Sequence, residues 1–147
     1  MSLKETIEQQ MKDALKSKDT FKLNVLRFIL SHIKNKEIDL RRPVTDDDVI
    51  KIIQTLVKQR KESLSFSQQA NRQDLIEKEQ EELKILESFL PSQLSEEEVE
   101  KIIDEVIEKV KPVGMKDMGK VMKEVMSRIS GRFDGSKINE MVRKKLS

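Results

Sequence analysis

One apolar stripe near the carboxyl end of the chain constrains the fold more than any other segment. Within residues 116–136, apolar side chains recur every three or four positions, so they share one face of a helix. Asp117 precedes the stripe as the expected N-cap, and Gly131 follows it as the expected left-handed C-terminal residue. A turn at residues 134–136 can cap the next helix. The segment therefore predicts a short amphipathic helix with a defined beginning and end, whose apolar residues are Met118, Val121, Met122, Val125, Met126 and Ile129.

Helical stripes of the same kind cover the rest of the chain. Capping residues stand before them at Ser2, Asp19, Thr45 and Ser95. Charged residues make up 38% of the chain, whereas glycine and proline together number only seven, which leaves little material for the turns of a many-stranded β fold. We therefore expect an all-α fold, with N-terminal helical hairpins followed by a small C-terminal three-helix domain.

Two expectations concern the packing of the N-terminal helices. Apolar residues surround most of the circumference of the second expected helix, so it should be the most buried helix of this half. The third and fourth helices are joined by a short polar turn and should pack antiparallel. The expected helices span residues 2–17, 20–38, 45–70, 75–90, 95–110 and 118–129, with a last helix that ends at Leu146.

The Pro-Ser-Gln-Leu sequence of residues 91–94 separates two independently capped parts of the chain. Proline stops the helix before it, and Ser95 with Glu98 forms a capping box for the helix after it. We expect an N-terminal α-helical domain of residues 1–92 and a C-terminal three-helix domain of residues 93–147.

Charge is unevenly distributed within the expected C-terminal domain. Residues 95–108 carry one Lys against seven Asp and Glu, whereas residues 109–147 carry eleven Lys and Arg against four Asp and Glu. An acidic helix beside two basic ones predicts a dipolar surface, with any anion site toward the carboxyl end.

The chain is poor in groups for catalysis or metal binding. It has no cysteine, and its only histidine, His32, lies among apolar residues of an expected helix, where a packing role is far more common than a role as a general base. Asp46, Asp47 and Asp48 fall in a first helical turn, where the helix dipole alone favours carboxylates. The sequence therefore predicts no catalytic residue, no metal site and no cofactor.

No part of the sequence resembles a membrane span or a secretory signal. No apolar run approaches the roughly 18 residues that a span needs, and the N-terminus begins with a polar helical pattern. The expectation is a soluble, cytoplasmic protein without a membrane partner.

The basic side chains of the last third allow two interpretations. They form either an ordinary solvated face or a face that binds phosphate, and the residues alone leave both open. The chain has no Tyr or Trp and only five Phe, so base stacking is a poor candidate. If RNA is bound, recognition of backbone and shape fits better than reading of single strands.

An ordered set of short motifs resembles one known family. Residues 118–122 (Met-Gly-Lys-Val-Met), Gly131, residues 134–135 and a final helix that ends at Leu146 resemble the GatB/YqeY tail motif. The resemblance to the stand-alone members of this family extends upstream over the whole chain, through residues 26–27, 33–35, 58–61, 71–75 and 89–94.

The resemblance implies an all-helical, two-domain chain related to the tail of the B subunit of the tRNA-dependent amidotransferase. That enzyme converts Glu-tRNA or Asp-tRNA to its amide, and a similar module is appended to some glutaminyl-tRNA synthetases. In those settings the tail is understood to help hold tRNA. The catalytic and nucleotide-binding parts of the amidotransferase lie outside the tail, and this sequence has no counterpart of them.

The resulting hypothesis is a non-enzymatic accessory protein that binds tRNA. The alternatives are an adaptor that docks on a synthetase or amidotransferase through its long helices, and a component of a carbon–nitrogen ligase that uses glutamine as amide donor only within a complex. The sequence leaves the oligomeric state open. Gly119 and Gly135 would allow close approach of the RNA. The expected phosphate-binding residues are Lys116, Lys120, Lys123, Arg128, Arg132 and Lys137.

Overall fold

The computed structural model of the chain describes residues 1–129 and 131–147, and within these ranges it contains helices, turns and connecting segments but no strand. This confirms the all-α fold expected from the caps and stripes. The chain divides into two compact units, Met1–Leu90 and Pro91–Ser147, which we call the N-terminal unit and the C-terminal unit. The division expected from the sequence lies two residues further along the chain and stays a prediction for the protein in solution.

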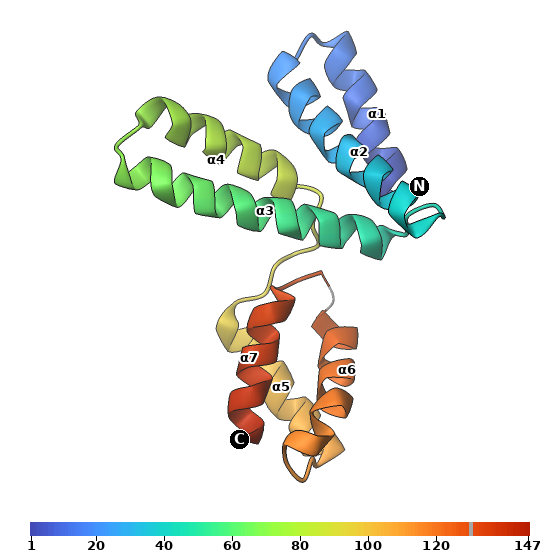
Figure 1. Ribbon diagram of the computed structural model, residues 1–147, viewed down its shortest axis with the longest axis vertical. Coiled ribbons are helices and arrows are strands. Elements are labelled where there is room, and N and C mark those ends of the chain that lie inside the picture. Colours follow the sequence, from blue (N-terminus) through green and yellow to red (C-terminus); the bar gives the residue numbers. More distant parts are fainter. Residues whose placement is uncertain (130) are drawn as a thin grey trace. The chain divides into compact units, whose positions relative to one another are not determined.

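The N-terminal unit consists of two antiparallel helical hairpins (Figure 1). The first hairpin pairs α1 (Leu3–Lys16) with α2 (Thr20–Leu40), and the second pairs α3 (Asp46–Gln69) with α4 (Gln73–Glu87). The antiparallel packing expected for the third and fourth helices is therefore confirmed. One apolar core joins all four helices, and its fully buried members are Ile7, Leu26, Ile29, Ile33, Val49 and Ile53.

Side-chain caps fix the beginnings of α1, α2 and α3 where the sequence places them. The hydroxyl of Ser2 accepts a hydrogen bond from the backbone N–H of Glu5, and the carboxylate of Asp19 accepts one from Lys22. Thr45 and Asp48 form a reciprocal capping box at α3. Such caps satisfy N–H groups that have no partner inside the helix, which typically contributes about 1 kcal/mol each.

A polar joint holds the two hairpins together at one end. Lys4 of α1 pairs with Glu37 of α2 at 2.9 Å, and the same carboxylate accepts a hydrogen bond from the backbone N–H of Val44 at 3.0 Å. The hydrogen bond from Lys4, supported by the one from Val44, lowers the pKa of Glu37 below its ordinary value. The backbone N–H of Leu3 donates to Asp46 at 2.8 Å, so α1, α2 and α3 meet through directed polar contacts as well as through the core.

The expectation that α2 is the most buried helix of this half is wrong, because α3 has five buried residues and α2 has four. The buried residues of α2, Leu23, Leu26, Ile29 and Ile33, occupy one side of the helix only. On the other sides, Phe21, Phe28 and Ile38 remain 37%, 46% and 65% exposed. The apolar residues do surround the helix, but α1, α3 and α4 cover only part of its circumference, so an aromatic surface remains open to solvent.

The C-terminal unit is a three-helix unit built around the apolar stripe of residues 118–129. It contains α5 (Glu96–Val110), the short 3₁₀ helix η1 (Met115–Asp117), α6 (Met118–Ile129) and α7 (Gly135–Leu146). Gly131 has φ 76°, as expected for a left-handed residue after the helix, and Asp134 caps α7 by accepting from the N–H of Ser136. Eight side chains of its core are fully buried: Val99, Ile103, Val106, Val121, Val125, Ile129, Ile138 and Val142.

Asp117 has a different partner from the one that the sequence suggests. It lies in η1, and its carboxylate accepts a hydrogen bond from the backbone N–H of Val113 at 2.8 Å. This contact points back into the loop before the helix, so Asp117 fixes the loop, whereas an N-cap would bond to the turn that follows it.

The residues of the expected domain boundary are attached to the C-terminal unit. The side-chain amide of Gln93 donates to the carbonyl of Gly131 at 3.0 Å, and the backbone N–H of Leu94 donates to that of Arg132 at 2.9 Å. The Nε–H of Arg132 donates in turn to the carbonyl of Ser92 at 2.9 Å. These three bonds hold the connecting segment against the α6–α7 turn.

Because Val125 is fully buried in this small core, we predict that Val125→Asp unfolds the C-terminal unit and leaves the N-terminal unit folded. An unpaired buried carboxylate costs roughly 3 kcal/mol or more, which is comparable to the whole stability of so small a unit. Two-dimensional NMR of the full chain should show collapsed signals for residues 95–147 only. Ser127→Asp, at an exposed position of the same helix, is the matched control and should keep all signals dispersed. A dispersed C-terminal unit in the Val125 variant would contradict our assignment of the core.

Candidate nucleic-acid interface

Three of the predicted phosphate-binding residues form one exposed row. Lys120 and Lys123 lie three residues apart in the first two turns of α6 and share one face of that helix, and Lys116 lies in η1, which runs directly into α6. All three are exposed. In the part of the chain that the structure describes, none of them has an ion pair with a carboxylate. We call these three residues the lysine strip.

The loop before α6 gives the lysine strip a fixed starting point. In addition to the bond between Val113 and Asp117, the backbone N–H of Asp117 donates to the carbonyl of Gly114 at 3.1 Å. Lys111 ends α5 in the left-handed conformation, with φ 53°, and is exposed. Lys111 lies at the other end of the same loop. It was not among the predicted site residues, although its position directly after the acidic helix could have indicated a basic residue beside the lysine strip.

Two other predicted residues are engaged by the acidic helix α5. Arg128 contacts Glu105 of α5 at 3.6 Å and Glu124 of its own helix at 3.4 Å. Lys137 of α7 forms an ion pair with Glu96 of α5 and lies 5.9 Å from the centre of the Phe133 ring. The hydrogen bond and charge of Glu96 raise the pKa of Lys137 above its ordinary value. Phosphate contact through Arg128 or Lys137 would have to compete with these carboxylates.

Two further cations form ion pairs between α5 and a neighbouring helix. Lys145 of α7 lies 2.8 Å from Asp104 and 3.1 Å from Glu100, and these bonds raise its pKa. Lys109 bonds Glu124 at 3.1 Å and thereby lowers the pKa of that carboxyl. The pairs that link α5 to its neighbours, which we call the α5 ion pairs, are Lys109–Glu124, Arg128–Glu105, Lys137–Glu96, Lys145–Glu100 and Lys145–Asp104.

Arg132 is also partly committed inside the unit, because its Nε–H bonds the carbonyl of Ser92. The predicted cations therefore fall into two groups. Lys116, Lys120 and Lys123 have no ion pair with any described residue, whereas Arg128, Arg132 and Lys137 have partners within the C-terminal unit. The structure therefore brings the three lysines together in one segment, and the other three cations are not part of this group.

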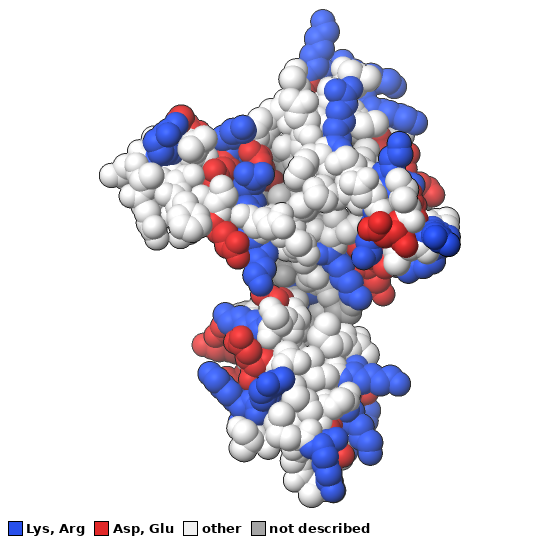
Figure 2. All heavy atoms as spheres, in the orientation of Figure 1, with Lys and Arg blue, Asp and Glu red and all other residues white. Residues whose placement is uncertain are grey.

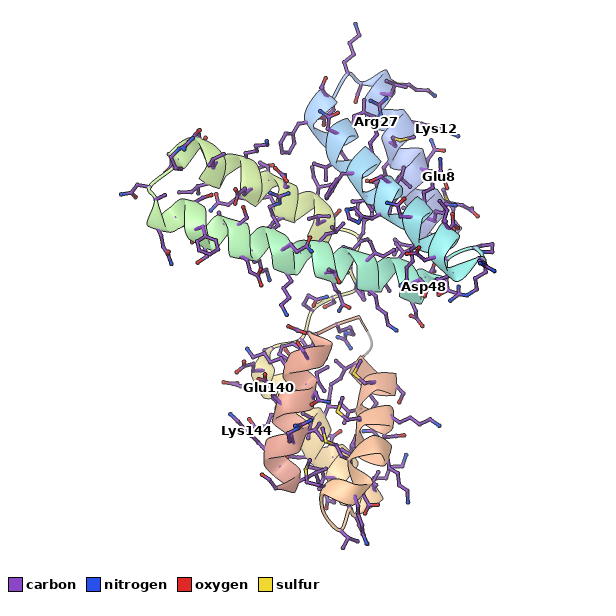
Figure 3. All side chains as sticks on the ribbon, viewed as in Figure 1. Glu8, Lys12, Arg27, Asp48, Glu140 and Lys144 are labelled. Carbon is purple, nitrogen blue, oxygen red and sulfur yellow. The ribbon has the colours of Figure 1, made fainter. Side chains whose placement is uncertain are left out.

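The α5 ion pairs change the charge distribution that the sequence suggests. On the C-terminal unit, Figure 2 shows acidic side chains beside basic ones where α5 and α7 lie, and mainly basic ones over α6. On the outer side of α7, Glu140 accompanies Lys144 one turn along the helix (Figure 3). Much of the excess basic charge of residues 109–147 is therefore matched locally, whereas the three residues of the lysine strip have no ion pair among the described residues.

The two predicted glycines differ in what surrounds them. A Cβ atom at Gly119 would meet nothing within 4 Å, and this residue is exposed in the first turn of α6. A Cβ atom at Gly135 would lie 3.7 Å from the Met126 side chain, which is an ordinary contact. Neither position requires glycine for internal packing, so the open surface at Gly119 is available for a ligand that approaches the helix closely.

His32, considered for catalysis, and Asp46 and Asp48, considered for metal binding, have structural partners. His32 is half-buried, with its ring edge-on to Phe28 at 4.7 Å between centroids. Asp46 and Asp48 are held by Leu3 and by the α3 cap, as described above. Among residues 1–129 and 131–147, no three His, Asp or Glu side chains gather as they would around a metal ion.

Every described helix is too short or too polar to cross a membrane.

Comparison with known proteins gives a family that covers nearly the whole chain. The model of the YqeY-like protein family matches residues 4–146. Two fungal relatives carry the name altered inheritance of mitochondria protein 41, mitochondrial. The protein from Vanderwaltozyma polyspora is 37% identical over 76% of this chain, and the one from Pyrenophora tritici-repentis is 31% identical over 92% of it.

A third relative belongs to an archaeal enzyme. It is a subunit of the glutamyl-tRNA(Gln) amidotransferase of Thermococcus gammatolerans, and it is 30% identical over 99% of this chain. The chain spans 64% of the length of the Vanderwaltozyma protein, 78% of the Pyrenophora protein and 24% of the archaeal protein. The similarity therefore covers about a quarter of the archaeal protein, and only that part is matched by this chain.

Gly119 allows a test that separates folding from ligand contact. Because Gly119 lies in an exposed helical turn with open space around it, Gly119→Ala should raise the stability of the C-terminal unit by about 0.5–1 kcal/mol. If the ligand approaches the helix closely at this point, the added methyl group should weaken RNA binding even though the fold is more stable. Thermal melting and tRNA titration of the same samples measure the two effects. Unchanged or tighter binding by the stabilised variant would contradict a close approach at Gly119.

Proposed function

Because the chain belongs to the YqeY-like protein family, we propose that it is a non-enzymatic accessory protein that binds tRNA through the lysine strip of its C-terminal unit. The observation that carries this proposal is the run of three exposed lysines in η1 and α6 that have no ion pair among the described residues, whereas Arg128 of α6 and Lys137 of α7 are paired with carboxylates. Lysines without carboxylate partners can neutralise phosphate without first losing an ion pair.

The spacing of the lysine strip suits a polyanionic backbone. From Lys116 to Lys123 the chain rises about 10 Å at the helical rise per residue, a length that reaches more than one phosphate of a nucleic-acid strand. Flexible lysine stems allow the three ammonium groups to adapt to the path of the backbone. In this proposal the strip positions folded RNA through its phosphates, and base identity contributes little.

The name of the archaeal relative supports tRNA as the RNA. That protein is named as part of an amidotransferase that acts on glutamyl-tRNA(Gln), and nearly all of this chain aligns with a portion of it. The activity of the whole archaeal protein is not transferred, because most of its length has no counterpart here. The carbon–nitrogen ligase hypothesis is therefore retained only as an alternative in which the chain acts within a larger complex.

The location of the protein is a separate part of the proposal. The sequence suggests a cytoplasmic protein, whereas the two fungal relatives are named as mitochondrial. We retain the cytoplasm as the proposed location and a mitochondrial location as the alternative, which fractionation of the native cells distinguishes.

The lysine strip should account for a measurable share of the salt dependence of tRNA binding. We predict that replacing Lys116, Lys120 and Lys123 together by Gln weakens binding to folded tRNA and flattens the log–log salt slope by up to about three units, because each neutralised phosphate releases counterions. Filter binding across a salt series, with wild type and variant in parallel, measures both quantities.

A matched control lies on α3, where Lys51, Lys58 and Lys61 are exposed and, within the described residues, have no ion pair. Replacing these three by Gln changes the net charge equally and should leave the slope nearly unchanged. Equal losses in the two triple variants would show that net charge, and not the strip, determines binding. A wild-type protein that does not bind tRNA even at low salt would exclude the proposed function and favour the adaptor hypothesis.

A further inference from the structure

The N-terminal unit contains a half-open groove that the proposed function does not use. It lies where α2 meets α3 and α4, and its volume is about 340 Å³. Phe21, Val25 and Phe28 of α2 form one wall, and the buried side chains of Leu56 and Leu86 contribute apolar surface from α3 and α4. The wall residues follow one another by four and three positions, so they form a single ridge along α2.

The apolar character of this wall is unusual for a surface without a partner. Phe21 and Phe28 remain 37% and 46% exposed, although aromatic side chains release much free energy when they are buried. Phe28 makes an edge-on contact with His32 on its own helix, but this contact leaves nearly half of the residue in solvent. A partner that packs on this ridge would remove the aromatic surface of the ridge from water, together with the partner's own apolar surface.

The polar side of the groove carries a net positive charge. Arg60 and Lys78 line it against a single carboxylate, Glu82, which Arg60 contacts at 3.0 Å. The buried Nε–H of Arg60 has no hydrogen-bond partner among the described residues, while 30% of the Arg60 side chain remains exposed. Lys78 is exposed and has no ion pair with any carboxylate in the described part of the chain. One additional carboxylate would balance the charge of the groove and give Lys78 a partner.

The shape of the site selects among possible occupants. An extended peptide usually binds by adding a strand to a sheet edge, and the described residues of this chain form no strand. A nucleic-acid backbone needs several free cations, whereas Lys78 is the one lining cation here without an ion pair among the described residues. A ridge with helical spacing beside a groove fits the side chains of another helix, which interdigitate at positions three, four and seven residues apart.

We propose that this groove binds an amphipathic helix of another protein, which places two or three apolar side chains against Phe21, Val25 and Phe28 and one carboxylate beside Arg60 and Lys78. The site is independent of the lysine strip, because every residue that lines it belongs to the N-terminal unit. The protein would thus have one face for RNA and a separate groove for a protein partner.

The first step of the test locates the occupant. Phe28 is replaced by the photo-crosslinking residue p-benzoylphenylalanine in the full chain, in the cells that natively make the protein, and Phe66 is replaced in the same way as a control. Phe66 is 71% exposed on α3 and does not line the groove. Position 28 should give a protein adduct that position 66 does not, and mass spectrometry should map it to a segment with apolar residues at helical spacing and an Asp or Glu beside them.

The second step measures binding of a synthetic peptide with the mapped sequence. Phe28→Ser should weaken binding about tenfold or more, because it removes a central aromatic contact. Lys78→Gln should weaken it about threefold, and this loss should disappear when the acidic residue of the peptide is replaced by its amide. Phe66→Ser should bind within about twofold of wild type, since surface changes away from the contact have little effect.

Several results would overturn the proposal. They are the absence of an adduct specific to position 28, an adduct with RNA or with a second copy of this chain, a mapped segment without the expected pattern, and peptide binding that Phe28→Ser leaves unchanged. Circular dichroism of each variant should match wild type, because both substituted phenylalanines are exposed.

Discussion

The carboxylates of α5 determine which cations of the C-terminal unit are free to meet a ligand. They lie along the helix beside its apolar stripe, so the two neighbouring helices that pack on the stripe also bring their basic residues within reach. Each exposed pair adds little stability, typically below about 1 kcal/mol. Their larger effect is on availability, because Arg128, Lys137 and Lys145 are held by α5, whereas the lysine strip has no ion pair among the described residues. The proposed RNA contact depends on this division.

The helices were predictable because local signals and packing agree. In the C-terminal unit, the stripe from Met118 to Ile129, the left-handed glycine and the Asp134 cap all specify the same two helices, and the structure has them at these residues. For α2 the same reasoning went too far. Apolar residues on most sides of a helix predict that the helix is central to its domain. The periodicity of the sequence does not show how many neighbouring helices pack against those residues. Phe21 and Phe28 remain exposed for this reason, and the groove beside them was not foreseen.

The candidate site was predictable as a set of basic residues in one segment, but not as a particular surface. The pairing of Lys137 with Glu96, or of Arg128 with Glu105, depends on how α6 and α7 are rotated against α5, which spacing within one helix does not define. The bond from Arg132 to Ser92 joins residues forty positions apart. Sequence reasoning therefore named the helices that carry the candidate interface, while the separation of free from paired cations required the three-dimensional packing.

The most direct test of this account is an NMR titration of the full chain with folded tRNA that follows the side-chain signals of individual lysines. If the α5 ion pairs determine which cations are available, the signals of Lys116, Lys120 and Lys123 should shift most with added tRNA, while those of Lys137 and Lys145 should stay close to their free positions. Equal or larger shifts at Lys137 and Lys145, or shifts confined to lysines of the N-terminal unit, would contradict the account.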